Sequence, residues 1–179
     1  MRTVVSNIEK VYTGRRFNVL KVLYRINGSL HTGEVVDFGN AVAILPFTND
    51  GKVIILRQYR VAIDKWIYEI PAGKVEEGES PEETAVREMI EETGYKPGRL
   101  IKLVSIYPSP GYSNEILHIF EARELTYIGA RREKDELINV IVMDYNEALN
   151  RVLSEEVADS KTLVALLYYA YKHGIKLTF

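Results

Sequence analysis

One stretch of the chain, Gly73 to Tyr95, limits the possible folds most strongly, because a loop, a helix and a set of acidic side chains follow one another in it. The run Ser80-Pro81-Glu82-Glu83 has the order of a helix N-cap, a first-turn proline and the glutamate of a capping box. Gly94 stands where helices commonly end in the left-handed conformation. The pattern predicts a helix over about residues 81–93.

Three glutamates of this helix are expected on one face. Glu88, Glu91 and Glu92 are related as i, i+3 and i+4, so their side chains cluster. Like charges at this spacing repel by about 0.2–0.5 kcal/mol unless a cation lies among them. Two interpretations follow: a solvated acidic helix face or, given the neighbouring glycine loop and Arg87, a site for Mg²⁺ or Mn²⁺ made of hard oxygen ligands.

The same stretch resembles the signature of the Nudix hydrolases. Gly73, Glu79 and the run Arg87 to Tyr95 fit the pattern G-x5-E-x7-R-E-U-x-E-E-x-G-U, in which U is a bulky aliphatic residue. Tyr95 is aromatic where an aliphatic residue is usual, and this difference concerns packing and not metal ligands. The resemblance implies an α/β fold, a Nudix α/β/α sandwich with a mixed sheet, preceded by a small N-terminal antiparallel β unit.

The composition excludes several classes of function. Of 179 residues, 46% are hydrophobic and 27% are charged, which suits one core-forming domain with a small addition. The net charge of −2 gives no reason to expect nucleic acid or a membrane as a partner. The chain has no cysteine, which excludes disulfides, thiolate catalysis and zinc sites built on cysteine. No apolar run has membrane-spanning length and no signal peptide is recognisable, so a cytoplasmic protein is expected.

Residues 1–38 are expected to form a separate β unit ahead of a main domain at residues 39–179. Apolar and other side chains alternate over residues 19–26, and Asn27-Gly28 is a strong signal for a two-residue hairpin turn. A sheet of two or three strands is marginal alone. It is therefore expected to pack on the main domain or on a second copy of the chain, as in a homodimer.

Continuous apolar runs indicate the core of the main domain. Residues 41–45 and 53–56 are apolar throughout and are separated by a turn at residues 49–51. Strands buried on both faces favour a layered α/β/α arrangement. Asp144 and Glu147 suggest a capping box for a helix over residues 145–153, and a last helix is expected from Asp159 or Ser160.

A loop after the signature resembles that of one subgroup of the family. Pro110 lies fifteen residues beyond Tyr95, and a proline at about that distance is typical of the ADP-ribose pyrophosphatase subgroup of the family. The alternative is that residues 107–115 simply form a turn, as Pro, Gly, Ser and Asn do anywhere. The segments Arg57–Arg60, Glu69–Gly73 and Asp159–Leu163 are also similar to this subgroup, whose members form dimers with exchanged N-terminal units.

The resemblance assigns metal ligands and a general base. Glu88, Glu91 and Glu92 are expected at the metals, with the backbone carbonyl of Ala72, and Glu92 thereby counts among the catalytic residues. Arg87 and Glu79 are expected to hold the loop and the helix together. The base is expected in the acidic loop before residue 138, at Glu136 first and Glu133 second; otherwise that loop is only a charged surface.

Substrate contacts are predicted at six positions. Arg60 could bind a phosphate through its planar fork or be solvated. Glu69 and Glu115 could accept hydrogen bonds from ribose hydroxyls or lie beside the metal ligands. Phe17 and Tyr12 are candidates for an adenine contact, although packing is the common role of such rings, and Pro110 belongs to the loop that should select the substrate. Trp66 is expected to be a core residue.

Three functions remain open. The first is Mg²⁺-dependent hydrolysis of ADP-ribose to AMP and ribose 5-phosphate, with Mn²⁺ as an alternative ion. The second is hydrolysis of another nucleoside diphosphate derivative, such as a nucleotide sugar, NADH or a dinucleoside polyphosphate. The third is a non-catalytic nucleotide-sensing module, which the intact signature disfavours.

Overall fold

A computed structural model describes residues 3–131 and 137–176. The chain divides into two compact units, and each is described by itself. Unit 1 runs through Asn40 and includes Tyr107–Ile116, and unit 2 contains Ala41–Ile106 and the chain from Leu117 onward. No helix in the described part of the chain is long and apolar enough to cross a membrane.

Unit 1 is a three-stranded antiparallel sheet, in the order β1 (Thr3–Thr13), β2 (Asn18–Ile26) and β3 (Ser29–Asp37). The predicted hairpin is confirmed: Ile26 pairs with Ser29, and the two residues between them have positive φ, 50° and 89°. Such a turn matches the right-handed twist of its strands, which explains why Asn27-Gly28 stands there.

The loop that contains Pro110 belongs to unit 1 rather than to the strands it connects. Val36 donates its backbone N–H to the carbonyl of Tyr112 at 2.7 Å. The side chain of Asn114 accepts from the backbone N–H of Phe38 at 2.9 Å and donates to Asp37 Oδ1 at 2.7 Å. The loop is thus held against the end of β3 by main-chain and side-chain hydrogen bonds.

Unit 2 is built on two larger sheets and one short pair of strands. The strands are β4 (Asn40–Pro46), β5 (Val53–Arg60), β6 (Lys65–Glu69), β7 (Ala72–Lys74), β8 (Tyr95–Lys96), β9 (Arg99–Ile106), β10 (Ile116–Arg123), β11 (Thr126–Tyr127) and β12 (Ile138–Met143). The strand orders are β7-β4-β10-β9, β12-β5-β6 and β11-β8. The two apolar runs predicted as core strands are β4 and β5, both almost entirely buried, and they lie in different sheets.

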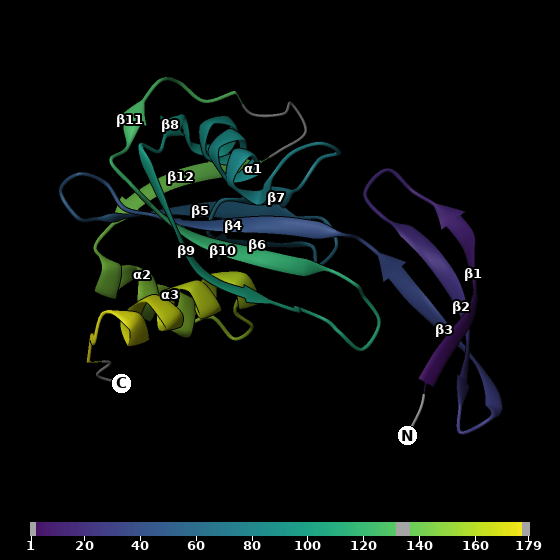
Figure 1. The fold of residues 1–179 in the computed structure, drawn as a ribbon. Coiled ribbons are helices and arrows are strands. Elements are labelled where there is room, and N and C mark those ends of the chain that lie inside the picture. Colours follow the sequence, from purple (N-terminus) through teal and green to yellow (C-terminus); the bar gives the residue numbers. More distant parts are fainter. Residues whose placement is uncertain (1–2, 132–136, 177–179) are drawn as a thin grey trace. The chain divides into compact units, whose positions relative to one another are not determined.

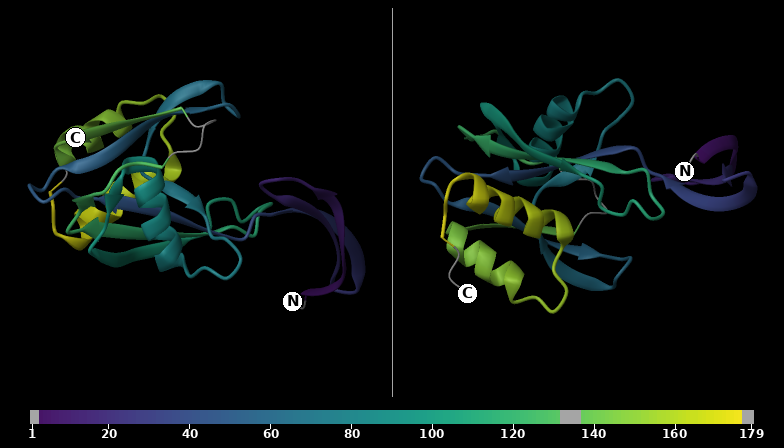
Figure 2. Two further views of the ribbon diagram at one scale, coloured as in Figure 1. Left: turned by 90° about the horizontal axis from the view of Figure 1, so that it is seen from above. Right: turned by 60° about the horizontal axis from the view of Figure 1, so that its bottom comes forward.

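Helices cover the strands of unit 2 from two sides. Helix α1 (Pro81–Glu88) lies on one side, and α2 (Tyr145–Leu153) and α3 (Ser160–Lys172) lie side by side on the other (Figures 1 and 2). Ala85 and Met89 pack beneath α1 on a cluster of fully buried side chains from β4, β5 and β10. The expected α/β/α sandwich with a small N-terminal β unit is confirmed.

Two predicted helix caps are confirmed, and two other predictions are wrong. Ser80 caps α1 in the predicted capping box, and Asp159 caps α3. The capping box predicted at Asp144 is wrong: Asp144 is the N-cap residue of α2, but its side chain makes no capping hydrogen bond. The core position predicted for Trp66 is also wrong, since this side chain is 40% exposed.

Candidate active site

The acidic helix changes its winding between Glu88 and the pair Glu91 and Glu92. After α1 the chain continues as one π-helical turn, η1 (Met89–Thr93), and ends at Gly94 with φ 82°. A Cβ on Gly94 would lie 2.8 Å from the backbone nitrogen of Ala130, so the left-handed end also needs a glycine for space. In a π turn the hydrogen bonds join residues five apart, so Glu91 and Glu92 are not at ordinary α-helical spacing from Glu88. Such turns are frequent at functional sites.

Arg87 is the centre of a cluster of carboxylates. Its Nε and Nη2 bind the two oxygens of Glu79 at 2.9 and 3.0 Å, and its Nη1 binds Glu88 at 2.8 Å and Glu91 at 3.1 Å. Nη2 also donates to the carbonyl of Lys74 at 3.2 Å. One guanidinium therefore faces three carboxylates, and the cluster keeps an excess of negative charge.

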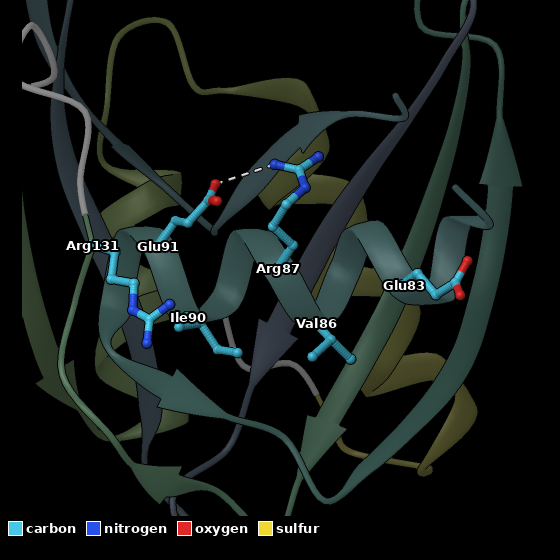
Figure 3. A pocket seen from close by; sticks show the side chains of 6 residues that line it. All are labelled: Glu83, Val86, Arg87, Ile90, Glu91 and Arg131. Atoms are coloured by element: carbon cyan, nitrogen blue, oxygen red, sulfur yellow. Dashed lines mark hydrogen bonds and ion pairs between the residues drawn. The ribbon is translucent and has the colours of Figure 1, made fainter. Parts of the chain in front are cut away.

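Figure 3 shows this helix face from close by. The side chains of Arg87 and Glu91 point to one side of the helix, and those of Val86 and Ile90 point to the other. A pocket there is lined by Glu83, Val86, Arg87, Ile90, Glu91 and Arg131. The backbone N–H of Arg131 donates to the carbonyl of Glu91 at 3.1 Å, which joins the segment after β11 to the π turn.

The hydrogen bonds around Arg87 have electrostatic consequences. Hydrogen bonds from Arg87 and from Thr84 lower the pKa of Glu79 to about 2. The bond to Glu79 in turn raises the pKa of Arg87 above its ordinary value. Glu79 stands in the loop before the helix and Arg87 stands in the helix, so the expectation that this pair holds loop and helix together is confirmed.

Two predicted metal ligands face the strand that precedes the helix. The Oε2 of Glu92, whose residue is 3% exposed, accepts the backbone N–H of Ala72 at 3.1 Å. A Cβ on Gly73 would lie 1.9 Å from Oε1 of Glu88, so only glycine lets this carboxylate approach the strand so closely. Glu88 and Glu92 thus lie against adjacent residues of one strand, and Ala72 is one of them.

These residues suit a hard divalent cation chemically. Carboxylates and a backbone carbonyl are the oxygen donors that Mg²⁺ and Mn²⁺ prefer. The space that a Cβ on Gly73 would fill is the space that the Glu88 carboxylate uses. Within residues 3–131 and 137–176, no group of three or more His, Cys, Asp or Glu side chains is placed so that it could hold a metal ion, and Glu88 and Glu91 both bind Arg87.

A second charged cluster has a carboxylate at its centre. Glu69 is 1% exposed and binds Nε of Arg60 at 2.6 Å through Oε1 and Nη2 at 2.7 Å through Oε2. The same Oε2 accepts a hydrogen bond from Nζ of Lys161, which also binds Asp159 at 2.9 Å. Burial alone would raise the pKa of Glu69, but the hydrogen bond from Arg60 and the charge of Lys161 hold it below its usual value. Arg60 and Glu69, predicted as two separate substrate contacts, are therefore one ion pair.

The other predicted site residues lie in unit 1 or outside the described residues. Tyr12 and Phe17 are 55% and 39% exposed in unit 1, with ring centroids 6.4 Å apart. Pro110 and Glu115 belong to the loop of unit 1, where the backbone N–H of Glu115 donates to the hydroxyl of Ser113. Glu133 and Glu136, the predicted general bases, lie outside the described residues.

Lys161 and Asn114 were given no role by the sequence alone. Lys161 stands at the start of the last helix, and Asn114 stands in the loop around Pro110. Their partners are 92 residues away in the case of Lys161 and Glu69, and 77 residues away in the case of Asn114 and Asp37. No local pattern signals a contact at that separation.

Comparison with known proteins agrees with this arrangement. The NUDIX domain matches residues 37–167. ADP-ribose pyrophosphatase of Bacillus subtilis is 39% identical over 171 residues, 94% of this chain and 92% of that protein. GDP-mannose pyrophosphatase of Salmonella typhimurium is 35% identical over 188 residues, 96% and 97% of the two chains. A crystal structure of an ADP compounds hydrolase, 22% identical, superposes with a TM-score of 0.83 over 98% of each chain and shows the same fold. The chain belongs to the Nudix family.

Proposed function

We propose that this chain hydrolyses the pyrophosphate bond of ADP-ribose to AMP and ribose 5-phosphate and that the reaction uses Mg²⁺. The observation that carries the proposal is the convergence of Glu88 and Glu92 on the strand at Ala72 and Gly73. The choice of substrate is supported by the 39% identity to an ADP-ribose pyrophosphatase over nearly the whole chain. A chain without cysteine suits the reducing cytoplasm, where we place the reaction.

The residues of the site have separable roles in this reaction. Glu88, Glu92 and the carbonyl of Ala72 would hold the divalent ion, with Glu91 beside them. The bound ion would neutralise charge on the pyrophosphate and activate water for attack. Arg60 would bind phosphate oxygens, since its planar fork suits them. Phosphoryl transfer depends on positioning and electrostatics, so side chains that fix these groups matter as much as those that touch substrate.

A second substrate class is favoured by a specific observation. GDP-mannose pyrophosphatases are 35% identical to the chain over almost its full length, so nucleotide sugars are the leading alternative. The test is to incubate the protein with Mg²⁺ or Mn²⁺ and a panel of ADP-ribose, GDP-mannose, ADP-sugars and NADH, and to identify the products. Release of AMP from ADP-ribose at a kcat/KM well above the others supports the proposal. Equal turnover of all compounds, or none of ADP-ribose, contradicts it.

We also propose that two copies of the chain form a homodimer through unit 1. In strand β1 the exposed fractions of Val4, Val5 and Ile8 are 49%, 54% and 58%. Exposed apolar side chains gathered on one strand are typical of an interaction surface. A second copy of the chain would cover it. Sedimentation equilibrium should give twice the mass of 20.5 kDa, and a monomer at micromolar concentration would refute this.

A further inference from the structure

The segment from the end of β6 to the start of β7 runs from the Glu69 cluster to the strand that faces Glu88 and Glu92. Residues 69–72 carry the buried Glu69 at one end and Ala72 at the other. Glu69 is held through its side chain, Ile70 donates its backbone N–H to the hydroxyl of Thr162 at 2.9 Å, and Ala72 donates its N–H to Glu92. Pro71 accepts the backbone N–H of Ile44 at 2.8 Å, so each of the four consecutive residues is fixed by a hydrogen bond from or to another element.

Two of these attachments come from the first turn of α3. Asp159 caps this helix: its Oδ2 accepts from the backbone N–H and the hydroxyl of Thr162, at 3.0 and 2.6 Å, and its Oδ1 accepts from Lys161. Thr162 is fully buried and the side chain of Lys161 is 15% exposed. The start of α3 is thus a rigid group that holds residues 69 and 70 through one ammonium and one hydroxyl.

Lys161 and Arg60 share Glu69 but are placed differently. The ammonium of Lys161 is committed to two carboxylates and is largely buried. Arg60 is 34% exposed at its side chain and uses its Nε–Nη2 edge on Glu69, and no other described residue accepts from its Nη1. Burial would lower the pKa of Arg60, but the hydrogen bond and charge of Glu69 raise it, and the charges of Glu92 and Asp159 add to this, so both carboxylates lie within electrostatic range of Arg60. Of the two cations, Arg60 is the one with a donor edge left for a ligand.

We propose that Lys161 is a positioning residue that acts through Glu69 to keep the guanidinium of Arg60 turned toward the substrate phosphates. The inference rests on the proposed function. Without the ammonium of Lys161, the carboxylates of Glu69 and Asp159 carry more negative charge than the one guanidinium of Arg60 compensates. An uncompensated buried charge is costly in free energy, so both carboxylates attract Arg60 more strongly. Arg60 then turns its remaining donors to these carboxylates and away from the substrate. The expected consequence is weaker substrate binding with little change in the chemical step.

The test is a double-mutant cycle on ADP-ribose hydrolysis. Lys161→Met should raise KM about 10-fold and change kcat less than about 3-fold, because the weakened interaction stabilises the bound substrate and the transition state equally. Lys161→Arg should restore most of the affinity, since it returns a cation to Glu69. In a protein that already carries Arg60→Ala, Lys161→Met should raise KM by less than a further factor of about 2, because Lys161 acts through Arg60. Lys172→Met, on the exposed last turn of the same helix, is the matched control.

Each other outcome overturns the inference. An unchanged KM in Lys161→Met excludes a role in binding, and the same factor with and without Arg60 means that Lys161 touches the substrate itself. The affinity of the same variants for inorganic pyrophosphate, measured by calorimetry without turnover, separates this inference from the proposed function. If the protein does not hydrolyse ADP-ribose, the proposed function fails, but the loss of pyrophosphate affinity and its dependence on Arg60 still decide the role of Lys161.

Discussion

The two charged clusters of unit 2 are opposite in design. Around Arg87, one cation holds the three carboxylates of Glu79, Glu88 and Glu91. Around Glu69, one buried carboxylate holds the two cations of Arg60 and Lys161. The first cluster has spare negative charge, and the second presents a cation whose donor edge is not used up.

This difference corresponds to the two kinds of charge in the proposed substrate complex, the positive divalent ion and the negative phosphates. Spare carboxylate oxygens attract divalent cations, and a spare guanidinium edge attracts phosphate oxygens. The segment 69–72 runs from Glu69 to the strand that faces Glu88 and Glu92, but the two clusters offer opposite charges. Changes in the first cluster should therefore affect metal-dependent chemistry, and changes in the second should affect affinity.

The strongest test of this division is Glu92→Gln, which removes one charge and keeps an oxygen for the N–H of Ala72. We expect kcat for ADP-ribose to fall by about 100-fold or more, because a proposed ligand of the divalent ion is lost, and with it the charge that holds the ion at the pyrophosphate. The free energy of unfolding should change by less than about 1 kcal/mol, since the hydrogen bond survives. Steady-state kinetics and urea unfolding give both values.

Glu147→Gln serves as the control for this change, because Glu147 is an exposed residue of α2 that pairs only with Arg151 in the described contacts. It should leave both quantities unchanged. Full activity in Glu92→Gln would remove Glu92 from the metal site and would break the comparison between the two clusters.

The next largest effect is expected for Gly73→Ala. The added Cβ would meet the Glu88 carboxylate at 1.9 Å, so either the strand or the carboxylate must move. Overpacking of this kind costs about 1–3 kcal/mol, and we expect kcat to fall by roughly 10-fold as Glu88 is displaced. Gly111→Ala, where a Cβ meets no atom within 4 Å, is the control for stability. A fully active Gly73→Ala would mean that the position of Glu88 against the strand is not required.

Most features encoded within a few residues were predictable from the sequence, although the capping box at Asp144 and the π turn were not, and contacts between distant segments were not predictable. The capping box at Ser80, the Asn27-Gly28 turn and the buried strands β4 and β5 each follow from local spacing. The pairing of Arg60 with Glu69 joins neighbouring antiparallel strands, but the sequence does not show that both residues face the same side or that Lys161 arrives from α3. The π turn was missed because i, i+3 and i+4 spacing was assumed to extend through Thr93.

Arg87→Lys tests whether the first cluster depends on the shape of the guanidinium or only on its charge. Lysine keeps the charge but has one nitrogen, so it cannot bind both oxygens of Glu79 through two nitrogens and still reach Glu88 and Glu91. We expect a loss of about 1–2 kcal/mol in the free energy of unfolding, measured by urea titration. Arg151→Lys, at an exposed i,i+4 pair, should cost less than about 0.5 kcal/mol. Equal losses in the free energy of unfolding for the two changes would show that the Arg87 cluster stabilises the fold no more than an exposed ion pair does.

The smallest expected effect is the part of the pH dependence of stability that comes from Glu79 in the first cluster. The pKa of Glu79 is lowered to about 2 in the folded protein, against 4.5 for a free glutamate, so between these values the unfolded chain binds more protons. Its contribution is therefore fully present above about pH 5 and is lost as the pH falls toward 2. Because the pair is partly solvated, we expect a contribution of about 1 kcal/mol or less. Urea unfolding at several values between pH 3 and pH 6 should show a shallower acid slope in Glu79→Gln than in the natural chain, and an unchanged slope would assign the acid sensitivity to other carboxylates.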